Sequence, residues 1–483
     1  MKIAPGNIFA PANQYLEKPG EKWRTLAIWA LICIPLLSLA LNALSWLRYG
    51  LDLPIYDDWR AYSNQTAGSL AIEHLFQSTH DTLYPVGMAL DALAQRHLNG
   101  NAVAYQFLSM LTVLGLLLYL QWKLLSLALR DTLLAASAFS LTLLMLQPGS
   151  YWGVQSLAYH HALPLVFCLA ALYLMLTRKE TDLWTLPVLF ALGILSGMSY
   201  ISGAFAATAI GIIVLVAGRF IPSSERRPMI KGALSFLSAA IITLVPQTWV
   251  IVGIQKGVYR PGASMSLPTE SDFWLFLLGK IARSLMLPSK TPLLSIIVTV
   301  LLVLAVSSLS VWLIRKFISG KMQGVAEARS AVVFLSLAGA VFVYLLLVAA
   351  GRANYRPPGV EGSIAIFTDA FRRFHFFWMT LLWPWLAAVC FEAIAGKNSR
   401  NPRKYLPLYA VLIPAVLLPL FISAGALKHR QWYRERSNHG IEAARCLQSE
   451  MRKGQGINCP ELHPQDLARP FTYGKSIGAS FGR

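Results

Sequence analysis

The amino-acid sequence predicts an all-α integral membrane protein, and both its composition and its patterning support this. The chain is 55% hydrophobic and only 13% charged, whereas a soluble domain carries about 25% charged residues. Its apolar residues gather in runs of about 20, the length that crosses a bilayer as a helix. Because lipid offers no partners to the backbone, such spans must satisfy their hydrogen bonds internally, and we expect helices.

About eleven transmembrane helices are expected, and the distribution of Lys and Arg orients them. With the N-terminus in the cytoplasm, every inner segment carries at least two basic residues, whereas the short outer loops around 150–160 and 199–203 carry none. An odd number of spans then places the C-terminal segment outside. The predicted spans are residues 25–46, 101–121, 132–148, 161–177, 183–199, 202–218, 232–254, 291–314, 330–350, 374–395 and 405–426.

This layout divides the chain into a cytoplasmic N-terminal tail (1–24), a transmembrane domain (25–426) and an outer C-terminal segment (427–483). The C-terminal segment is expected to be either a small cap, helical over 440–451, or a partly disordered arm. It contains Cys446 and Cys459, which we predict to be bridged, since disulfides persist in oxidising compartments. The sequence has no CxxC, no metal-spaced Cys/His set and no glycine-rich nucleotide motif, so nothing supports a cytoplasmic nucleotide-binding function.

The first outer loop, residues 47–100, is the one clearly acidic segment of a chain whose net charge is +19. Asp57 and Asp58 stand side by side in it, followed by Trp59. Carboxylates just outside a membrane span are candidates for general-base chemistry. The structural alternative is that Asp58 caps a short helix beginning at Trp59, with Asp57 a solvated charge.

Further along the same loop, the polar pair His80-Asp81 precedes a segment with helical periodicity. Residues 84–98 carry apolar and polar positions on opposite faces, which predicts an amphipathic helix lying on the membrane. The loop is therefore expected to hold two interfacial helices that join at this pair. Its other acidic residues, interpreted as structural, are Asp52, Glu73 and Asp91.

Two later outer loops, residues 255–290 and 351–374, are rich in Arg and Lys, against the positive-inside rule. Cations on this side indicate either contact with lipid headgroups or an anionic ligand, and arginine binds phosphate bidentately. For Lys280 and Arg283 the alternative is snorkelling from an interfacial helix over 273–287. The candidate phosphate-binding residues are Arg260, Arg352, Arg356, Arg372 and Arg373.

Taken together, these features resemble the GT-C glycosyltransferases. The family's first-loop motif is similar to Tyr56-Asp57-Asp58-Trp59. The stretch 79–85 resembles a second polar motif that many bacterial members carry before a proline, and the loop 352–373 resembles their late basic loop. The resemblance covers the whole chain by architecture, but only these short motifs by sequence.

The resemblance implies an enzyme of the bacterial inner membrane that transfers a sugar, with inversion, from a polyprenyl phosphate carrier to an acceptor on the periplasmic face. Asp57 or Asp58 is expected to remove the acceptor's proton, and the arginines to stabilise the leaving phosphate. The acceptor stays open: lipopolysaccharide O-antigen, lipid A, another surface glycan or a protein such as pilin. No nucleic-acid partner and no cofactor are expected. The second outer loop lacks an acid that some members carry, so a divalent metal is unsupported.

The second outer loop, residues 147–161, is polar and aromatic but uncharged at neutral His. It is expected to be either an aromatic belt at the membrane surface or one wall of a sugar pocket. The candidate substrate-binding residues are Trp59, His80, Asp81, Trp152, Gln155 and His160.

Two other function classes stay open at this point. A lipid-linked glycan transporter or flippase is expected to carry charges inside its spans, whereas almost all charges here fall between the predicted spans. An O-antigen polymerase-like or ligase-like enzyme would rely on outer arginines and need no early acidic pair.

Overall fold

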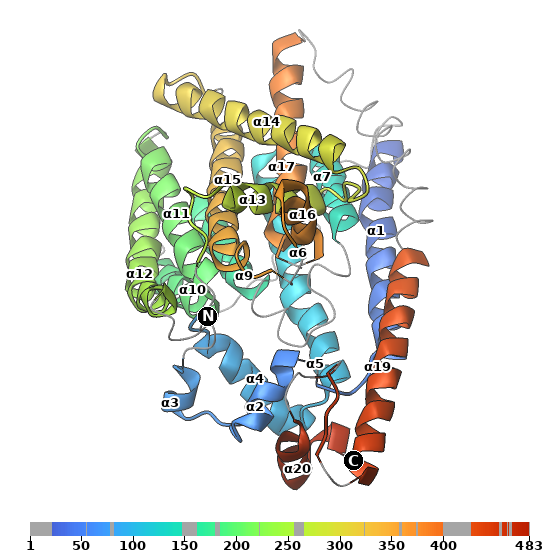
Figure 1. The fold of residues 1–483 in the computed structure, drawn as a ribbon. Coiled ribbons are helices and arrows are strands. Elements are labelled where there is room, and N and C mark those ends of the chain that lie inside the picture. Colours follow the sequence, from blue (N-terminus) through green and yellow to red (C-terminus); the bar gives the residue numbers. More distant parts are fainter. Residues whose placement is uncertain are drawn as a thin grey trace.

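The computed structural model describes residues 22–54, 56–77, 82–146, 162–178, 184–221, 223–255, 265–322, 324–356, 360–372, 375–398, 427–453, 456–460, 462 and 466–482. This part of the chain is built from helices and contains no β-strand (Figure 1). Six of the described helical stretches are long and apolar enough to cross a membrane: Arg24–Tyr49, Ala102–Ala128, Ile201–Gly218, Glu225–Gly253, Pro292–Ile318 and Val325–Arg352. The chain is therefore a multi-pass, all-α membrane protein.

Ten of the eleven predicted spans coincide with helices, and the eleventh, 405–426, lies outside the described residues. Four of the ten, over α7, α9, α10 and α17, have apolar stretches of only 10–17 residues. The helices are confirmed, while the full number of crossings stays a prediction. The helices that coincide with the ten predicted spans are α1 (Lys22–Tyr49), α5 (Ala102–Ser109) continuing through η2 (Met110–Leu114) into α6 (Gly115–Ala128), α7 (Thr132–Met145), α9 (Leu163–Thr177), α10 (Thr185–Ser199), α11 (Ile201–Gly218), α12 (Ser223–Gln255), α14 (Pro292–Ile318), α15 (Val325–Arg352) and α17 (Phe377–Asn398).

Local signals explain where several helices begin and end. The Asp131 side chain accepts from the backbone N–H of Leu133 at 2.7 Å and so caps α7. The predicted amphipathic helix is confirmed as α4 (Pro85–Leu98). It starts with proline, whose missing N–H costs nothing in a first turn, and it ends at Asn99 in the left-handed conformation.

Small residues let α10, α11 and α12 approach one another closely. A Cβ added to Gly197 of α10 would lie 1.9 Å from the Oγ1 of Thr243 on α12. One added to Gly203 of α11 would lie 2.0 Å from the carbonyl oxygen of Ser196 on α10. Because lipid supplies no hydrophobic drive between helices, close packing at such residues is what holds these helices together.

The helix expected over 273–287 is present as α13 (Ser271–Ser284), and more than half of its residues are buried within the protein. It contacts α16 (Ser363–Asp369) and η4 (Ala370–Arg372). Lys280 is fully buried, and its Nζ donates a hydrogen bond to the carbonyl of Ala370 at 2.6 Å. The Lys280 ammonium therefore does not snorkel to the membrane surface.

The C-terminal segment covers the first outer loop. That loop forms η1 (Tyr56–Trp59), α2 (Arg60–Ser63), α3 (Ile72–Leu75) and α4, and the tail forms α19 (Leu427–Lys453), α20 (Ala468–Ser476) and η7 (Ser480–Gly482). α19 runs beside α1, and α20 contacts α2 (Figure 1). Cys446 and Cys459 form the predicted disulfide. The described part of the tail is thus a cap and not a disordered arm.

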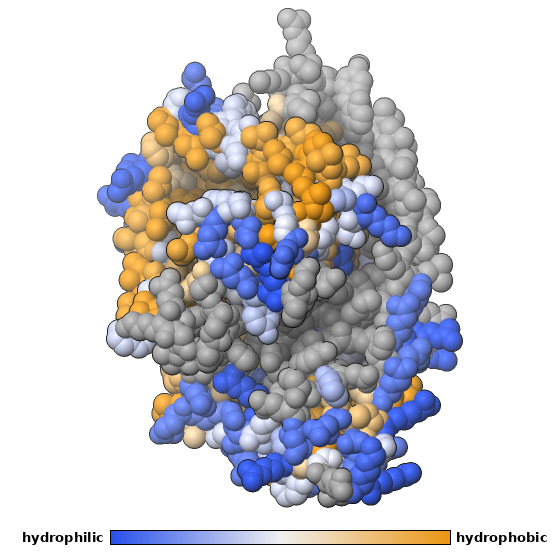
Figure 2. Space-filling model, viewed as in Figure 1, coloured by the Kyte–Doolittle hydropathy of each residue, from blue (hydrophilic) through white to orange (hydrophobic). Residues whose placement is uncertain are grey.

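Loop and cap share one hydrophobic core. Trp59 and Tyr62 of the loop pack edge-on against Phe481 of the tail, with ring centroids 5.1 and 4.9 Å apart. The Tyr473 hydroxyl also donates to the carbonyl of Gln65 at 3.1 Å. Figure 2 shows hydrophilic residues gathered at this end of the molecule and hydrophobic residues over the helices above it. The first loop and the tail therefore lie on the same side of the membrane.

Charged residues from the predicted inner segments meet at the other end of the bundle. Arg24 pairs with Asp131 at 2.5 Å, and Arg130 pairs with Glu327 at 3.5 Å. These residues come from the start of α1, the α6–α7 turn and the start of α15. The structure thus gathers these three segments on one side, while the compartment that this side faces stays a prediction.

Candidate functional site

A buried glutamine on α12 holds the chain that follows His80-Asp81. Gln247 is fully buried. Its Nε2 donates to the carbonyls of Leu83 at 2.7 Å and Gly197 at 2.9 Å, and its Oε1 accepts from the Leu83 N–H at 3.1 Å. One side chain thus satisfies three buried backbone groups, each of which would be costly to leave unpaired.

Thr82 and Leu83 make further contacts with the same end of the bundle. The Thr82 hydroxyl accepts from the backbone N–H of Ile201, at the start of α11, at 2.8 Å. Leu83 packs against Val250 of α12 and against Met265. The second polar motif is therefore fixed to the ends of α10, α11 and α12. His80 and Asp81 themselves lie outside the described residues.

The late basic loop begins at this same end. Ser266 donates its backbone N–H to the carbonyl of Ala350 near the end of α15, at 2.9 Å. α15 packs against α11, and the segment after α11 and the start of α15 line the same pocket, so the end of α15 lies near the start of α11. Since Thr82 is bonded to Ile201 at the start of α11, the second polar motif and the start of the arginine-rich loop lie at the same end of the bundle.

Arg356 is engaged within the protein. Its guanidinium pairs with Asp272 of α13, and its Nε donates to the carbonyl of Ala353 at 2.6 Å. Nearby, Ser266 Oγ donates to Glu270 at 2.7 Å, and this hydrogen bond is the main cause that lowers the pKa of the Glu270 carboxyl. Arg356 thus joins the start of α13 to the end of α15, and a bound phosphate would have to compete with Asp272 for it.

Asp57 and Asp58 lie in η1, under the cap. The position of the next residue, Trp59, corrects the expectation that its side chain binds substrate. Trp59 is fully buried in the core shared by loop and cap, so it packs there and does not offer a face for a sugar to stack on. Asp58 is half-buried and acts electrostatically on Tyr62. The N-cap position of α2 is Trp59, not Asp58, which removes the simplest capping explanation for Asp58.

The two motifs of the first loop flank α4. The hydroxyl of Tyr62, which follows η1, donates to Gln95 near the C-terminal end of α4 at 2.7 Å. The second motif immediately precedes Pro85 at the N-terminal end. Pro85 and Gln95 are ten residues apart, a rise of about 15 Å along the helix. α4 therefore acts as a spacer between the Asp57-Asp58 pair and the second motif.

Asp91, interpreted from the sequence as structural, is an unusual carboxyl. Burial raises its pKa to about 6, and a hydrogen bond from the Tyr105 hydroxyl opposes this rise. The pair joins α4 to α5. A carboxyl with such a pKa titrates close to neutral pH, which its position in the sequence does not indicate.

Several predicted site residues lie outside the described part of the chain: His80, Asp81, Trp152, Gln155, His160, Arg260 and Arg373, together with the side chains of Asp57 and Arg372. Among the residues that are described, no group of three or more His, Cys, Asp or Glu side chains is placed to hold a metal ion. Sequence reasoning missed Gln247, although a glutamine inside an apolar span is itself a signal of a specific partner.

The helices and this outer-loop assembly define a multi-pass, all-α membrane protein with a cap over its first loop. No protein-family model matches the chain, and no curated protein matches it.

Proposed function

We propose that this chain is a GT-C-type membrane glycosyltransferase that moves a sugar, with inversion, from a polyprenyl phosphate carrier to a surface glycan, lipid or protein acceptor. One observation carries the proposal. Thr82 and Leu83 of the acidic loop are hydrogen-bonded to the ends of α10–α12, at the end of the bundle where α15 ends and the arginine-rich loop starts. This transfer needs a carboxylate and a phosphate-binding loop on one face of the membrane, and the bound substrates would have to bridge the length of α4 between the second motif and the Asp57-Asp58 pair.

In the proposed reaction the acceptor oxygen attacks the anomeric carbon of the sugar while the bond from that carbon to the carrier phosphate breaks. Asp57 or Asp58 takes the acceptor's proton. Arg352, with Arg372, Arg373 and Arg260 as further candidates, stabilises the negative charge that the leaving phosphate gains. His80 and Asp81 would orient the sugar or acceptor, with Trp152, Gln155 and His160 along a wall of its pocket.

The proposed location is the bacterial inner membrane, with the N-terminus in the cytoplasm and the C-terminus in the periplasm. The Cys446–Cys459 bridge suits this orientation, because disulfides persist in the oxidising periplasm. The cap that carries the bridge lies with the acidic loop, so both would face the compartment in which the acceptor is glycosylated.

The test is transfer by the purified full chain, using labelled polyprenyl phosphate sugars extracted from membranes. If Asp57 or Asp58 is the base, its replacement by Asn lowers turnover by about 10²–10⁴-fold. Glu73→Gln, an exposed carboxylate on the same loop, is the matched control and should leave turnover unchanged. Native turnover in both Asp57→Asn and Asp58→Asn would remove this loop from the chemistry.

A second arm separates donor binding from the chemical step. Arg352→Ala should raise the donor concentration needed for half-maximal rate, and Arg352→Lys should restore it only in part, because lysine lacks the bidentate fork. Movement of a lipid-linked glycan across vesicles without any transfer would favour a flippase instead. Glycan polymerisation that survives loss of both aspartates would favour a polymerase-like enzyme.

A further inference from the structure

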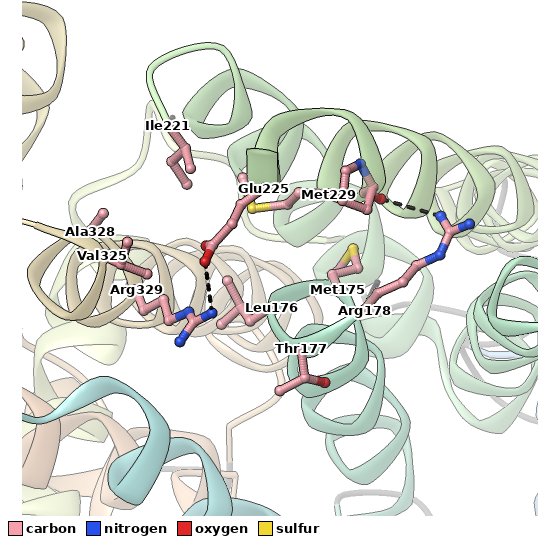
Figure 3. A pocket seen from close by; sticks show the side chains of 11 residues that line it. Met175, Leu176, Thr177, Arg178, Ile221, Glu225, Met229, Val325, Ala328 and Arg329 are labelled. Carbon is pink, nitrogen blue, oxygen red and sulfur yellow. Dashed lines mark hydrogen bonds and ion pairs between the residues drawn. The ribbon is translucent and has the colours of Figure 1, made fainter. Parts of the chain in front are cut away.

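A pocket of about 310 Å³ lies at the end of the bundle opposite the candidate site. The end of α9, the segment after α11 and the starts of α12 and α15 line it (Figure 3). Its volume is at the lower end of the range for ligand pockets, enough for a headgroup and its first methylene groups. Nothing in the proposed transfer reaction uses this pocket.

Two arginines and one carboxylate give the pocket its polar groups. Arg329 Nη2 pairs with Glu225 at 3.2 Å, and the Nε of Arg329 is buried without a hydrogen-bond partner in the described structure. Arg178 donates from Nη1 to the carbonyl of Pro228 at 3.2 Å. Arg329 therefore has donor capacity in the pocket beyond its bond to Glu225.

The rest of the lining is mostly apolar. Figure 3 shows Arg329 and Arg178 on opposite sides of the pocket, with Met175, Leu176 and Met229 between them. A fully hydrated anion gains nothing from such walls. A ligand with an anionic head and an apolar body satisfies both parts of the lining.

The position of the pocket along the helices places it at a membrane boundary. Arg329 and Arg352 are 23 residues apart on α15, a rise of about 35 Å. The hydrocarbon core of a bilayer is about 30 Å thick. With the candidate site at one water–membrane boundary, the pocket therefore lies at the other, at the depth of lipid headgroups. Exposed Arg226 and Arg227 stand beside it in the first turn of α12.

We propose that this pocket binds the phosphate of an anionic phospholipid, with the guanidinium of Arg329 as its main contact. The lipid's first methylene groups lie on Met175 and Met229, and its acyl chains stay in the bilayer. The exposed Arg226 and Arg227 add positive potential. Basic pockets between membrane helices on the cytoplasmic side suit anionic headgroups. Glu225 competes with the phosphate for Arg329, so it limits the affinity of the site.

The test measures thermal unfolding of the purified full chain in detergent micelles containing increasing phosphatidylglycerol, with phosphatidylcholine and inorganic phosphate alone as separate arms. Phosphatidylglycerol should raise the unfolding temperature in a saturable way, since it binds the folded state. Phosphatidylcholine and inorganic phosphate should not. An equal response to phosphatidylcholine would overturn the proposal, and a response to inorganic phosphate alone would assign the pocket to a free anion.

Three variants locate the effect. Arg329→Gln should raise the half-saturating phosphatidylglycerol concentration by about tenfold, the loss expected for one charge-assisted hydrogen bond. Arg227→Gln removes an exposed charge on the neighbouring helix turn and should change it less than about twofold. Glu225→Gln should lower the half-saturating phosphatidylglycerol concentration, and a misfolded variant would not show such an increase in affinity. The pocket assignment would be overturned if the half-saturating phosphatidylglycerol concentration changed in Arg227→Gln but not in Arg329→Gln or Glu225→Gln.

Discussion

Individual buried polar side chains attach the first outer loop to the membrane bundle. Gln247 satisfies Leu83 and Gly197, and Thr82 satisfies the N–H of Ile201. On the other side of the loop, Asp52 accepts from the backbone N–H of Ala102 at 2.9 Å. Because these groups are buried or half-buried, losing one partner leaves the other unpaired, at about 1–3 kcal/mol each. The position of the loop therefore depends on a few specific residues.

Asp91 gives a prediction at this scale. Its folded-state pKa of about 6 lies above the ordinary value of 3.8, so the folded protein holds this proton more tightly than the unfolded chain does. Its stabilising effect is complete below about pH 4, is lost as the pH rises toward 6, and amounts to no more than about 3 kcal/mol.

We expect Asp91→Asn to flatten the dependence of the unfolding temperature on pH between 4 and 6, and to raise that temperature above pH 6. Glu73→Gln, on the exposed part of the same loop, is the control and should keep the native profile. Thermal unfolding from pH 4 to pH 8 measures both, and a native profile in Asp91→Asn would contradict the assignment.

Among the elements, α13 depends most on close packing. Gly279 faces α16, where an added Cβ would lie 2.3 Å from the carbonyl oxygen of Phe367 and 2.6 Å from the Cβ of Ala370. The next residue, Lys280, donates to the Ala370 carbonyl. α13 is thus held against α16 and η4 at Gly279 and Lys280, and a side chain at position 279 would push these segments apart.

Gly279→Ala should therefore destabilise the protein by about 1–3 kcal/mol, because the backbone of α16 has to move. Gly115→Ala is the matched control, since Gly115 also lies in a helix but an added Cβ there meets nothing within 4 Å. The control should be neutral or stabilise by up to about 1 kcal/mol. Denaturation of both purified variants measures the difference, and equal effects would show that α13 and α16 are not in contact.

For the whole molecule, the two ends of the bundle carry different chemistry. At one end the disulfide-linked cap packs on the acidic loop, and the arginine-rich loop starts at the end of α15. At the other end ion pairs and the basic pocket join the predicted inner segments. α11, α12 and α15 run between the two ends (Figure 1).

This arrangement predicts which residues a membrane-impermeant maleimide reaches in spheroplasts. In a variant without Cys33, Cys168 and Cys390, we expect labelling at Asn64→Cys and Ser476→Cys, both in the loop and cap. Arg226→Cys and Ser319→Cys should react only after permeabilisation. All four positions are exposed in the structure. Labelling of only one of the first two would contradict the shared side of loop and cap, and a fully reversed pattern would invert the proposed orientation.

The sequence by itself was enough to determine the class of the protein and the positions of its described spans, since long apolar runs have one stable solution in lipid. The helix over 85–98 and the Cys446–Cys459 bridge were also predictable, because periodicity and cysteine placement are local signals. From the sequence, the outer loops could be expected to lie together only by resemblance to a family. In the structure, Gln247 bonds to Leu83 and Ser266 bonds to Ala350.

Tertiary structure alone decided which polar residues have partners. Trp59 is buried by a tail more than 400 residues away, Arg356 is paired with Asp272, and Lys280 is sealed inside the bundle by Ala370. Each of these residues had been assigned from the composition of its own loop. Hydropathy reports how a residue suits water or lipid, but its partner depends on which distant segments pack against it, and that is settled only when the whole bundle is assembled.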